Sequence, residues 1–576
     1  MPRSSRFAAA RALALSAAVL VPLCQPPAAV AESPGSSPSA GLELTPLGTH
    51  ETGVFDESAA EIPAYDPDSE RLFVVNAHAG RLDVLRIADN GAPRAETTLA
   101  ATGLPAEDGS TTDAGATANS AAVSGGVLAV AVEPADKTER GWVMFFDAAT
   151  LRHLGGVRVG TLPDSLAFTP NGSHVIVANE GEPAEDYTVD PEGTVSVIDV
   201  PRSIQQFDRL DQSAVRTVDF RAYDEGTPLP EGVRVFGPDV PVPDGHEEAG
   251  RVARNLEPEF VSVDPTGRTA YVSLQEADAI AAVDVRAAEL TDLWPLTDTD
   301  WSVDGRLDPS NKDDGIHRAH HPVSGVPMPD GIDVYRHRGQ DVIVTANEGD
   351  GREWGEFTDA ERVKELQLCQ DAFDDVEALQ QNAALGRLHV LTDLGVRAGE
   401  NCHESLYALG GRSFSIYTAE GERLFDSAGM IEAQIERLIE AGELPEHAFN
   451  ANNDETPSGD SRSDDKGPEP EDVVIGEVTG RTYAFVGLER VGGVMVFDIT
   501  DPRHPSYVDY VNGRNWHAEG EDGDAGLGDM GAEGLQFVPG SDSPTGQPLL
   551  IVANEVSGST TVYGVGTVSY THLRAH

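Results

Sequence analysis

The stretch PDSLAFTPNGSHVIVANE at residues 163–180 decides the fold class. It contains an acidic residue, a short apolar strand, a turn with Pro, Asn and Gly, a second apolar strand and the pair Asn179-Glu180. A third strand follows at residues 194–200. Short apolar runs bounded by turn residues are typical of buried strands. When such a unit recurs along a chain, it predicts a repeat architecture.

The unit recurs. Seven copies of the first-strand signal occur, at Glu61, Asn119, Asp164, Glu259, Asp330, Glu471 and Glu533. Third strands are expected at 82–87, 142–147, 194–200, 279–285, 387–392, 493–499 and 560–563. Because each unit is a run of antiparallel strands, we predict an all-β fold, a seven-bladed β-propeller.

Long inserts separate the repeats, at 201–250, 286–328, 351–386, 393–412 and 418–468. Loops tolerate insertion better than strands do. The apolar spacing of segments 360–385 and 428–444 predicts helical inserts. Segment 42–49 has no partner in its own repeat, so we expect it to supply the outer strand of the last blade and to close the ring.

The two ends of the chain differ from the repeat region, which we place at 42–564. Residues 1–31 have the charged start, apolar middle and A-x-A site of a secretory signal peptide. The alternative is a lipoprotein acylated at Cys24. Residues 565–576 resemble a translated adapter and are interpreted as a non-native tail. No later segment is apolar enough to cross a membrane.

The composition limits the partners. The chain has 97 acidic and 40 basic residues, a formal net charge of −57. Such a surface argues against nucleic acid and favours cations, basic ligands or a salty milieu, although solubility alone also explains it. We expect a monomer. Cys369 and Cys402 remain after removal of the signal, and in an exported protein they predict a disulfide, with two free thiols as the alternative.

Strand direction turns the repeat into a candidate site. The first and second strands are antiparallel and the first is innermost, so the start of the first and the end of the second lie at the same rim. The first-strand acids should therefore surround one mouth of the central channel. The acids that follow the second strands should lie just outside them, at Glu133, Glu180, Glu276, Glu348, Glu489 and Glu555.

So many carboxylates around one mouth would repel one another. A hard cation such as Ca²⁺, which takes roughly six to eight oxygen ligands, is one remedy. Its candidate ligands are Asp164, Glu180, Glu259, Asp330, Glu348, Asp350, Glu471, Glu489, Glu533 and Glu555. Interleaved basic residues are a second remedy, offered by Arg352, Arg462, Lys466 and Arg490. Hydrogen bonds from turn amides to the acids are a third.

Several stretches resemble one family. They are MPDGI at 328–332, TANEGD at 345–350, SRSDDKGPEPE at 461–471, GLER and GVMVFD between 487 and 498, and LIVANEVSG at 550–558. Together they resemble the choice-of-anchor I family, similar to mesenchyme-specific cell surface glycoproteins. The resemblance implies an exported propeller of the YVTN/WD40-like kind, secreted or held at the cell surface. Some members of the family are labelled alkaline phosphatase.

Two functions follow from these observations. The first is an exported or cell-surface binding module that takes an unknown ligand at its acidic mouth, with Ca²⁺ as the candidate cofactor. The alternative is a metal-dependent phosphoesterase, similar to propeller phytases. There the acids would hold metal, the four basic residues would hold phosphate, and a metal-bound water would attack. No catalytic residue is assigned, and whether the chain is an enzyme stays open.

Overall fold

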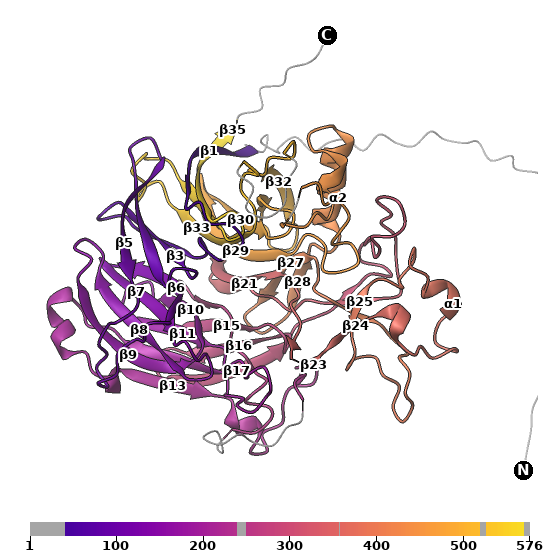
Figure 1. Cartoon of the computed structure of the whole chain (residues 1–576), viewed down its shortest axis with the longest axis horizontal. Helices are drawn as coiled ribbons and strands as arrows, with labels where there is room; N and C mark the ends of the chain where they lie inside the picture. The colour runs from indigo at the N-terminus through magenta and orange to yellow at the C-terminus, as the bar shows by residue number, and fades with distance from the viewer. Residues whose placement is uncertain (1–40, 239–248, 356, 455, 519–525, 569–576) are drawn as a thin grey trace, which may run out of the picture. The chain divides into compact units, whose positions relative to one another are not determined.

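The repeat copy that begins at residue 163 forms a four-stranded antiparallel sheet in the computed structural model of the chain (Figure 1). Its strands are β10 (Pro163–Phe168), β11 (His174–Asn179), β12 (Thr194–Asp199) and β13 (Val215–Asp219). Between β10 and β11 the chain reverses at Gly172, whose φ of +66° suits glycine. Asn171 Oδ1 accepts a hydrogen bond from the Ser173 amide at 2.9 Å, which fixes this turn.

The structure describes residues 41–238, 249–355, 357–454, 456–518 and 526–568, and within them six further copies form the same kind of sheet. Three come from the N-terminal half: β2 (Pro63–Asp66), β3 (Arg71–Asn76), β4 (Arg81–Ile87) and β5 (Pro93–Ala100); β6 (Thr117–Ser124), β7 (Val127–Glu133), β8 (Arg140–Asp147) and β9 (His153–Thr161); β14 (Val261–Val263), β15 (Thr269–Leu274), β16 (Ala279–Asp284) and β17 (Glu289–Pro295). Three come from the C-terminal half: β20 (Ile332–His337), β21 (Gln340–Asn347), β27 (Ser413–Thr418) and β28 (Arg423–Asp426); β29 (Pro470–Val478), β30 (Arg481–Leu488), β31 (Val494–Asp498) and β32 (Ser506–Val511); β33 (Ala532–Val538), β34 (Leu549–Asn554), β35 (Ser559–Val568) and β1 (Gly41–Glu51).

The sheets follow one another around a circle. Their first strands contact each other in chain order, β2, β6, β10, β14, β20, β29 and β33, and β33 contacts β2. The first strand is thus the inner strand of each sheet, and the fold is a β-propeller, as predicted. β1 pairs with β35, from Gly41 opposite Val568 to Glu51 opposite Ser559, which confirms the predicted closure by the N-terminal segment. β35 continues to Val568, past residue 564 where the sequence placed the end of the propeller.

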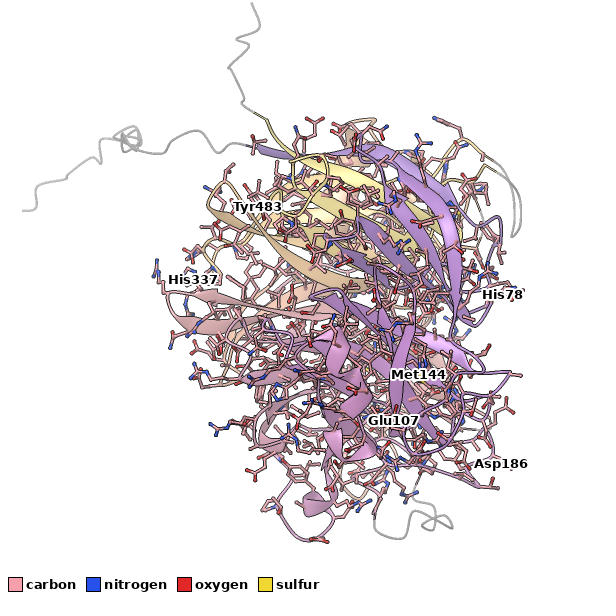
Figure 2. The ribbon with its side chains drawn as sticks, turned by 90° about the vertical axis from the view of Figure 1, so that its left-hand side faces the viewer. His78, Glu107, Met144, Asp186, His337 and Tyr483 are labelled. Carbon is pink, nitrogen blue, oxygen red and sulfur yellow. A yellow bond between two sulfur atoms is a disulfide. The ribbon has the colours of Figure 1, made fainter. Side chains whose placement is uncertain are left out.

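An apolar cluster fills each space between neighbouring sheets. In the cluster between the β20 and β29 sheets, Phe414 of β27 meets Phe497 of β31 with ring centroids 4.6 Å apart. Met144 of β8 lies fully buried in the cluster between the β2 and β6 sheets, whereas His78 and Asp186 lie exposed at the margin (Figure 2). Burial of these faces holds neighbouring sheets together and fixes where their inner strands begin.

The insert 348–412 between β21 and β27 builds a second kind of sheet together with segment 296–331, which lies between β17 and β20. Its strands are β18 (Thr299–Asp300), β19 (Ser324–Val326), β26 (Tyr407–Leu409), β25 (His389–Leu391) and β24 (Ala360–Arg362). Within the insert, a hairpin of β22 (Glu353–Trp354) and β23 (Phe357–Thr358) precedes β24. The sequence placed the third strand of the fifth repeat at 387–392, which is wrong. That role belongs to β27, because the apolar run of β25 pairs with β24 and β26 instead.

The helical inserts are confirmed in one place and wrong in the other. Segment 428–444 contains α2 (Met430–Glu440), which buries Ile431 and Ile435 against the β20 and β29 sheets. Segment 360–385 forms β24, the 3₁₀ turn Val363–Glu365 and only the short helix α1 (Val376–Leu379). Strand pairing of β24 with β25 overrides the helical spacing there. β24, β25 and α1 lie together at one side of the propeller (Figure 1).

The predicted disulfide is present. Cys369 and Cys402 are bonded, with their Cα atoms 5.2 Å apart. The bond joins two loops of the insert, next to the pairing of Leu368 with His403. The predicted signal peptide at 1–31, its alternative at Cys24, and residues 569–576 of the predicted tail lie outside the described residues.

Candidate functional site

A cavity of about 120 Å³ lies inside the circle of inner strands. Residues at or near the start of all seven inner strands line it: Ile62, Ser120, Ser165, Phe260, Asp330, Asp472 and Glu533. The predicted first-strand acids Glu61 and Asp164 line it as well. Glu259 interacts electrostatically with Asp164 and Asp330, and Glu471 with Asp330 and Glu533. Four of the six first-strand acids thus line one cavity, and the other two, Glu259 and Glu471, interact with acids that line it.

The Asn of the repeated Asn-Glu pair is structural. Asn347 Nδ2 donates to the hydroxyls of Ser413 and Ser415, at 2.9 and 2.8 Å. Asn179 Nδ2 donates in the same way to Ser196 Oγ at 3.1 Å, and Asn554 Nδ2 to Ser559 Oγ at 3.2 Å. In each case the amide ties the end of the second strand to the third strand.

The Glu of the same pair faces the mouth. Glu180 interacts with Asp164, Glu348 with Glu471, and Glu555 with Glu61 and Glu533. Glu489, which follows the second strand of the sixth repeat, interacts with Glu348 and Glu469. The outer acids are thus close enough to the first-strand acids to share their electrostatic field, as strand direction predicted.

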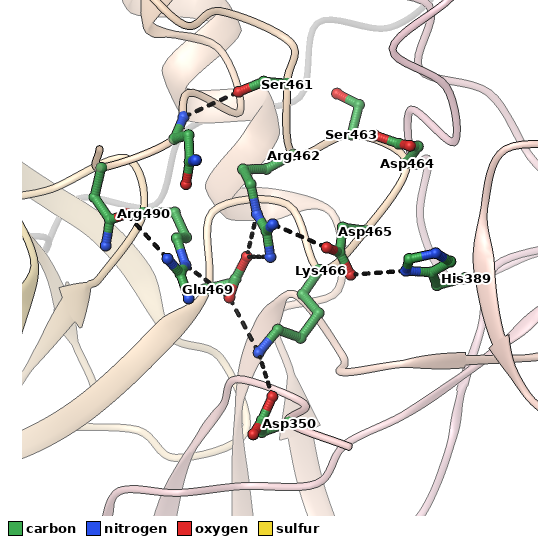
Figure 3. Close-up of polar contacts among 12 residues, drawn as sticks. Asp350, His389, Ser461, Arg462, Ser463, Asp464, Asp465, Lys466, Glu469 and Arg490 are labelled. Atoms are coloured by element: carbon green, nitrogen blue, oxygen red, sulfur yellow. Dashed lines mark hydrogen bonds and ion pairs between the residues drawn. The ribbon is translucent and has the colours of Figure 1, made fainter. Parts of the chain in front are cut away.

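Three basic side chains converge on Glu469 (Figure 3). Arg462 Nε lies 2.8 Å from Glu469 Oε1, and Lys466 Nζ and Arg490 Nε lie 3.1 and 3.2 Å from Oε2. Burial alone would raise the pKa of Glu469, but Lys466, Arg462 and Arg490 lower it. We call Glu348, Glu469 and Glu489, with Arg462, Lys466 and Arg490, the paired cluster.

Lys466 and Arg490 also contact the two neighbouring acids of the paired cluster. Lys466 Nζ lies 2.5 Å from Glu348 Oε1 and 3.0 Å from the exposed Asp350 Oδ1, and Arg490 Nε lies 3.1 Å from Glu489 Oε2. Burial outweighs these contacts and raises the pKa of Glu348 to about 7 and that of Glu489 to about 8. The cluster therefore balances its charges within a buried network.

Buried Arg412 holds the loop that carries Lys466. Its guanidinium donates to the carbonyl oxygens of Ser463 and Asp465, both at 2.7 Å. Arg387 Nη2 donates to Asp464 at 2.6 Å. The distinctive run 461–471 is thus ordered by arginines from outside it, and this order directs Lys466 toward the mouth.

The fourth predicted basic residue, Arg352, pairs with an acid that sequence reasoning missed. Its guanidinium bonds to Glu257, and both side chains are buried. Glu469 was likewise not nominated. A common signal could have found the two, because Glu257 and Glu469 each stand two residues ahead of a first-strand acid.

Six of the remaining mouth acids have no such partners. Burial is the main cause that raises the pKa of each well above its ordinary value, and their strongest charge interactions are with other carboxylates. We call them the acid-only cluster: Glu61, Asp164, Glu180, Glu259, Glu471 and Glu533. Glu259 Oε2 and Glu471 Oε2 are buried and accept no hydrogen bond from the described residues.

Asp330, Glu348 and Glu471 meet where the two clusters join. One carboxylate oxygen of each lies within 4.8 Å of the others. Burial raises the pKa of Asp330 and of Glu471, and a hydrogen bond between the two carboxyl groups lowers the former and raises the latter. This triad offers only oxygen ligands, the kind that hard divalent cations prefer.

A larger cavity of about 320 Å³, here called the side cavity, lies beside the paired cluster. The insert supplies Trp354 of β22, His389 of β25 and Leu409 of β26 to its wall. All four predicted basic residues line it: Arg352, Arg462, Lys466 and Arg490. Asp465 also lines it, and although burial opposes this, its contacts with His389 and Arg462 lower its pKa.

Two known proteins are similar to parts of this chain. Gigasin-3a of Magallana gigas is 33% identical over 207 residues, which are 34% of this chain and 68% of gigasin-3a. The mesenchyme-specific cell surface glycoprotein of Strongylocentrotus purpuratus is 30% identical over 283 residues, which are 43% of this chain and 35% of that protein. This chain thus spans about a third of the sea urchin glycoprotein.

Among solved structures, hydrazine synthase of Kuenenia stuttgartiensis aligns with a TM-score of 0.43 at 13% identity, covering 88% of this chain and 96% of that one. The propeller assignment itself rests on the sheet topology above. In the part of the chain that the structure describes, no helix has the length and apolar character needed to span a bilayer. The model of the choice-of-anchor I domain matches residues 61–502, so the chain belongs to the choice-of-anchor I family.

Proposed function

We propose that this chain is an exported or cell-surface β-propeller binding module whose channel mouth holds a divalent cation, Ca²⁺ first among them. Its membership of the choice-of-anchor I family supports a surface role, as does its likeness to a protein named a cell surface glycoprotein. The predicted signal peptide points the same way.

One observation carries the cation site. Glu471 Oε2 is buried in a residue only 7% exposed and has no donor among the described residues, and Glu471 belongs to the oxygen triad with Asp330 and Glu348. Glu471 shares a hydrogen bond with the Asp330 carboxyl group, but a buried carboxylate oxygen that no donor reaches is costly unless a proton or a cation neutralises the group. A cation at the triad would satisfy this oxygen and offset the repulsion that reaches Glu471 from Glu533.

A calcium titration followed by thermal unfolding tests this proposal. A cation that binds only the folded state must raise the melting temperature. At a concentration a hundredfold above Kd, such binding increases the free energy of unfolding by about 2.7 kcal/mol. We expect the rise in the unaltered chain and in Glu477→Gln, a matched variant at an exposed position of the same strand, but not in Glu471→Gln. An unchanged melting temperature up to millimolar Ca²⁺ would count against the site.

The phosphoesterase alternative requires basic side chains that are available to phosphate. Each nominated residue instead contacts a carboxylate: Arg352 contacts Glu257, Lys466 contacts Glu348, and Arg462 and Arg490 contact Glu469. These pairs favour the binding module. Release of phosphate from an aryl phosphate in the presence of Ca²⁺, abolished by EDTA, would restore the alternative.

A further inference from the structure

Gln275 occupies a position of the repeat that is structural in four other repeats. There the second strand ends in an asparagine whose side-chain amide donates to the third strand of the same sheet, at Asn76, Asn179, Asn347 and Asn554. In the fourth repeat the corresponding pair is Gln275-Glu276, directly after β15. Glutamine thus replaces asparagine at this place, with a side chain that is one methylene longer.

The third strand of the fourth repeat offers Gln275 no hydroxyl. Its sequence in β16 is AIAAVD, whereas β12 and β27 read TVSVID and SFSIYT, with a hydroxyl at the first and third positions. The Gln275 amide extends beyond its own sheet instead. Its Nε2 donates to Glu348 Oε2 at 2.7 Å, and Glu348 follows the second strand of the next sheet. Both residues are buried, so this hydrogen bond joins two neighbouring sheets at the channel mouth away from solvent.

The hydrogen bond from Gln275 completes the fixing of the Glu348 carboxylate. Glu348 Oε1 lies 2.5 Å from Lys466 Nζ, so each of its two oxygens has a donor from outside its own repeat. A carboxylate oxygen has two lone pairs, and one remains for a cation after a single hydrogen bond. Glu348 belongs to the oxygen triad with Asp330 and Glu471. A ligand whose orientation is already fixed loses little freedom when it takes up a cation, and its hydrogen-bond partners thereby raise the affinity.

We infer that Gln275 is a positioning residue of the cation site, whose amide orients the Glu348 carboxylate within the triad and so sets the affinity for the cation. The inference rests on the proposed function and deepens it, because it identifies a residue that controls the site without being one of its ligands. An amide suits this role, since it directs the carboxylate without adding a positive charge that would repel the cation.

Calorimetric titration of the folded chain with Ca²⁺, well below its melting temperature, tests the inference. Gln275→Met keeps the length of the side chain but removes the donor, and it should raise the Kd for Ca²⁺ about 10–100-fold. Gln275→Asn keeps an amide that is one methylene shorter, and it should raise the Kd as well because it does not reach Glu348. The control Asn179→Ala removes the equivalent amide of the third repeat, which bonds within its own sheet, and should leave the Kd unchanged.

Melting temperatures in EDTA separate positioning from stability. Losing one hydrogen bond leaves a domain of ordinary stability folded, so Asn179→Ala should melt earlier and still bind Ca²⁺ normally. A purely structural role for Gln275 would give the same result, a lower melting temperature with an unchanged Kd. If both Gln275 variants bind Ca²⁺ at least as tightly as the unaltered chain, the inference is overturned and the cation site stands. If the unaltered chain binds no Ca²⁺, the inference and the cation site are both overturned.

Discussion

The two sides of the channel mouth carry the same type of carboxylate in opposite surroundings. In the paired cluster, all six carboxylate oxygens have a partner: those of Glu348 contact Lys466 and Gln275, those of Glu469 contact Arg462 and Arg490, and those of Glu489 contact Asn453 and Arg490. In the acid-only cluster, Glu259 and Glu471 each keep a buried oxygen that no donor of the described residues reaches. The first side is therefore complete within the chain, whereas the second needs protons or a cation.

This difference separates stability from binding. Three tethered basic groups act on the paired cluster as permanent counterions, and breaking a buried pair leaves an uncompensated charge. The acid-only cluster gains nothing from remaining ionised without a ligand. A cation bound there can therefore change the stability of the whole propeller, because residues at or near the start of all seven inner strands line the same cavity as Glu61, Asp164 and Glu533.

The sharpest test of the comparison uses two glutamates that lie two residues apart. Glu469→Gln removes the shared partner of Arg462, Lys466 and Arg490 and should lower the free energy of unfolding by about 3–5 kcal/mol. Glu471→Gln removes a carboxylate whose neighbours are acidic and should raise it by about 1–3 kcal/mol in EDTA. Urea denaturation measures both, with Glu477→Gln as the control. Changes of the same sign would refute the distinction between the clusters.

Lys466→Met tests the paired cluster from its basic side. The ammonium group contacts Glu348, Asp350 and Glu469, and its loss leaves Glu348 with only Gln275 as a partner among the residues described. We expect a loss of about 2–3 kcal/mol, smaller than for Glu469→Gln because two arginines still hold Glu469. Lys312→Met, at an exposed position, is the matched control. If both variants unfold at the same urea concentration, Lys466 is not the counterion that its contacts indicate.

The sequence predicted the ring of acids because the direction of each strand follows from the strands and turns within a single repeat. Alternation of short apolar strands with turns at Asn171-Gly172 places the start of one strand and the end of the next at one rim, and Asn179 marks that rim. The same reasoning could not assign the apolar run of β25, because strand pairing across an insert of this length depends on tertiary contacts. The helix predicted at 360–385 failed for the same reason.

The sequence also left open which groups neutralise the charge of the mouth acids and which ones accept hydrogen bonds from the backbone amides near them. In the structure, different neighbouring residues have these two roles. Backbone amides are capped by the residue after the repeat acid: Ser165 Oγ accepts from the Val261 amide, and Asp472 Oδ2 from the Leu535 amide at 2.8 Å. The acid itself thus remains directed at the channel. Within the paired cluster, the basic side chains neutralise the carboxylates. Which carboxylate each one contacts depends on how the 461–471 loop folds around Arg412, and the sequence did not predict this.

The last prediction concerns how stability depends on pH. Each unit by which folding shifts the pKa of one carboxyl group changes the free energy of unfolding by about 1.4 kcal/mol between the two pH extremes. Raised pKa values mean that the folded state holds protons that the unfolded state releases. The stability that Glu276 and Glu348 contribute is therefore complete below their unfolded pKa of about 4.3 and is lost as pH rises through about 7, and that of Glu489 through about 8.

In EDTA we thus expect the melting temperature to fall between about pH 5 and pH 8, with the acid-only carboxyl groups adding to the fall. Glu469 has the opposite sign, since its lowered pKa makes its contribution vanish only in acid. Saturating Ca²⁺ should flatten the alkaline fall, because a bound cation takes the place of the protons. A fall of equal slope with and without Ca²⁺ would show that protons alone neutralise the mouth. A flat profile in EDTA would show that its acids are not held as the geometry requires.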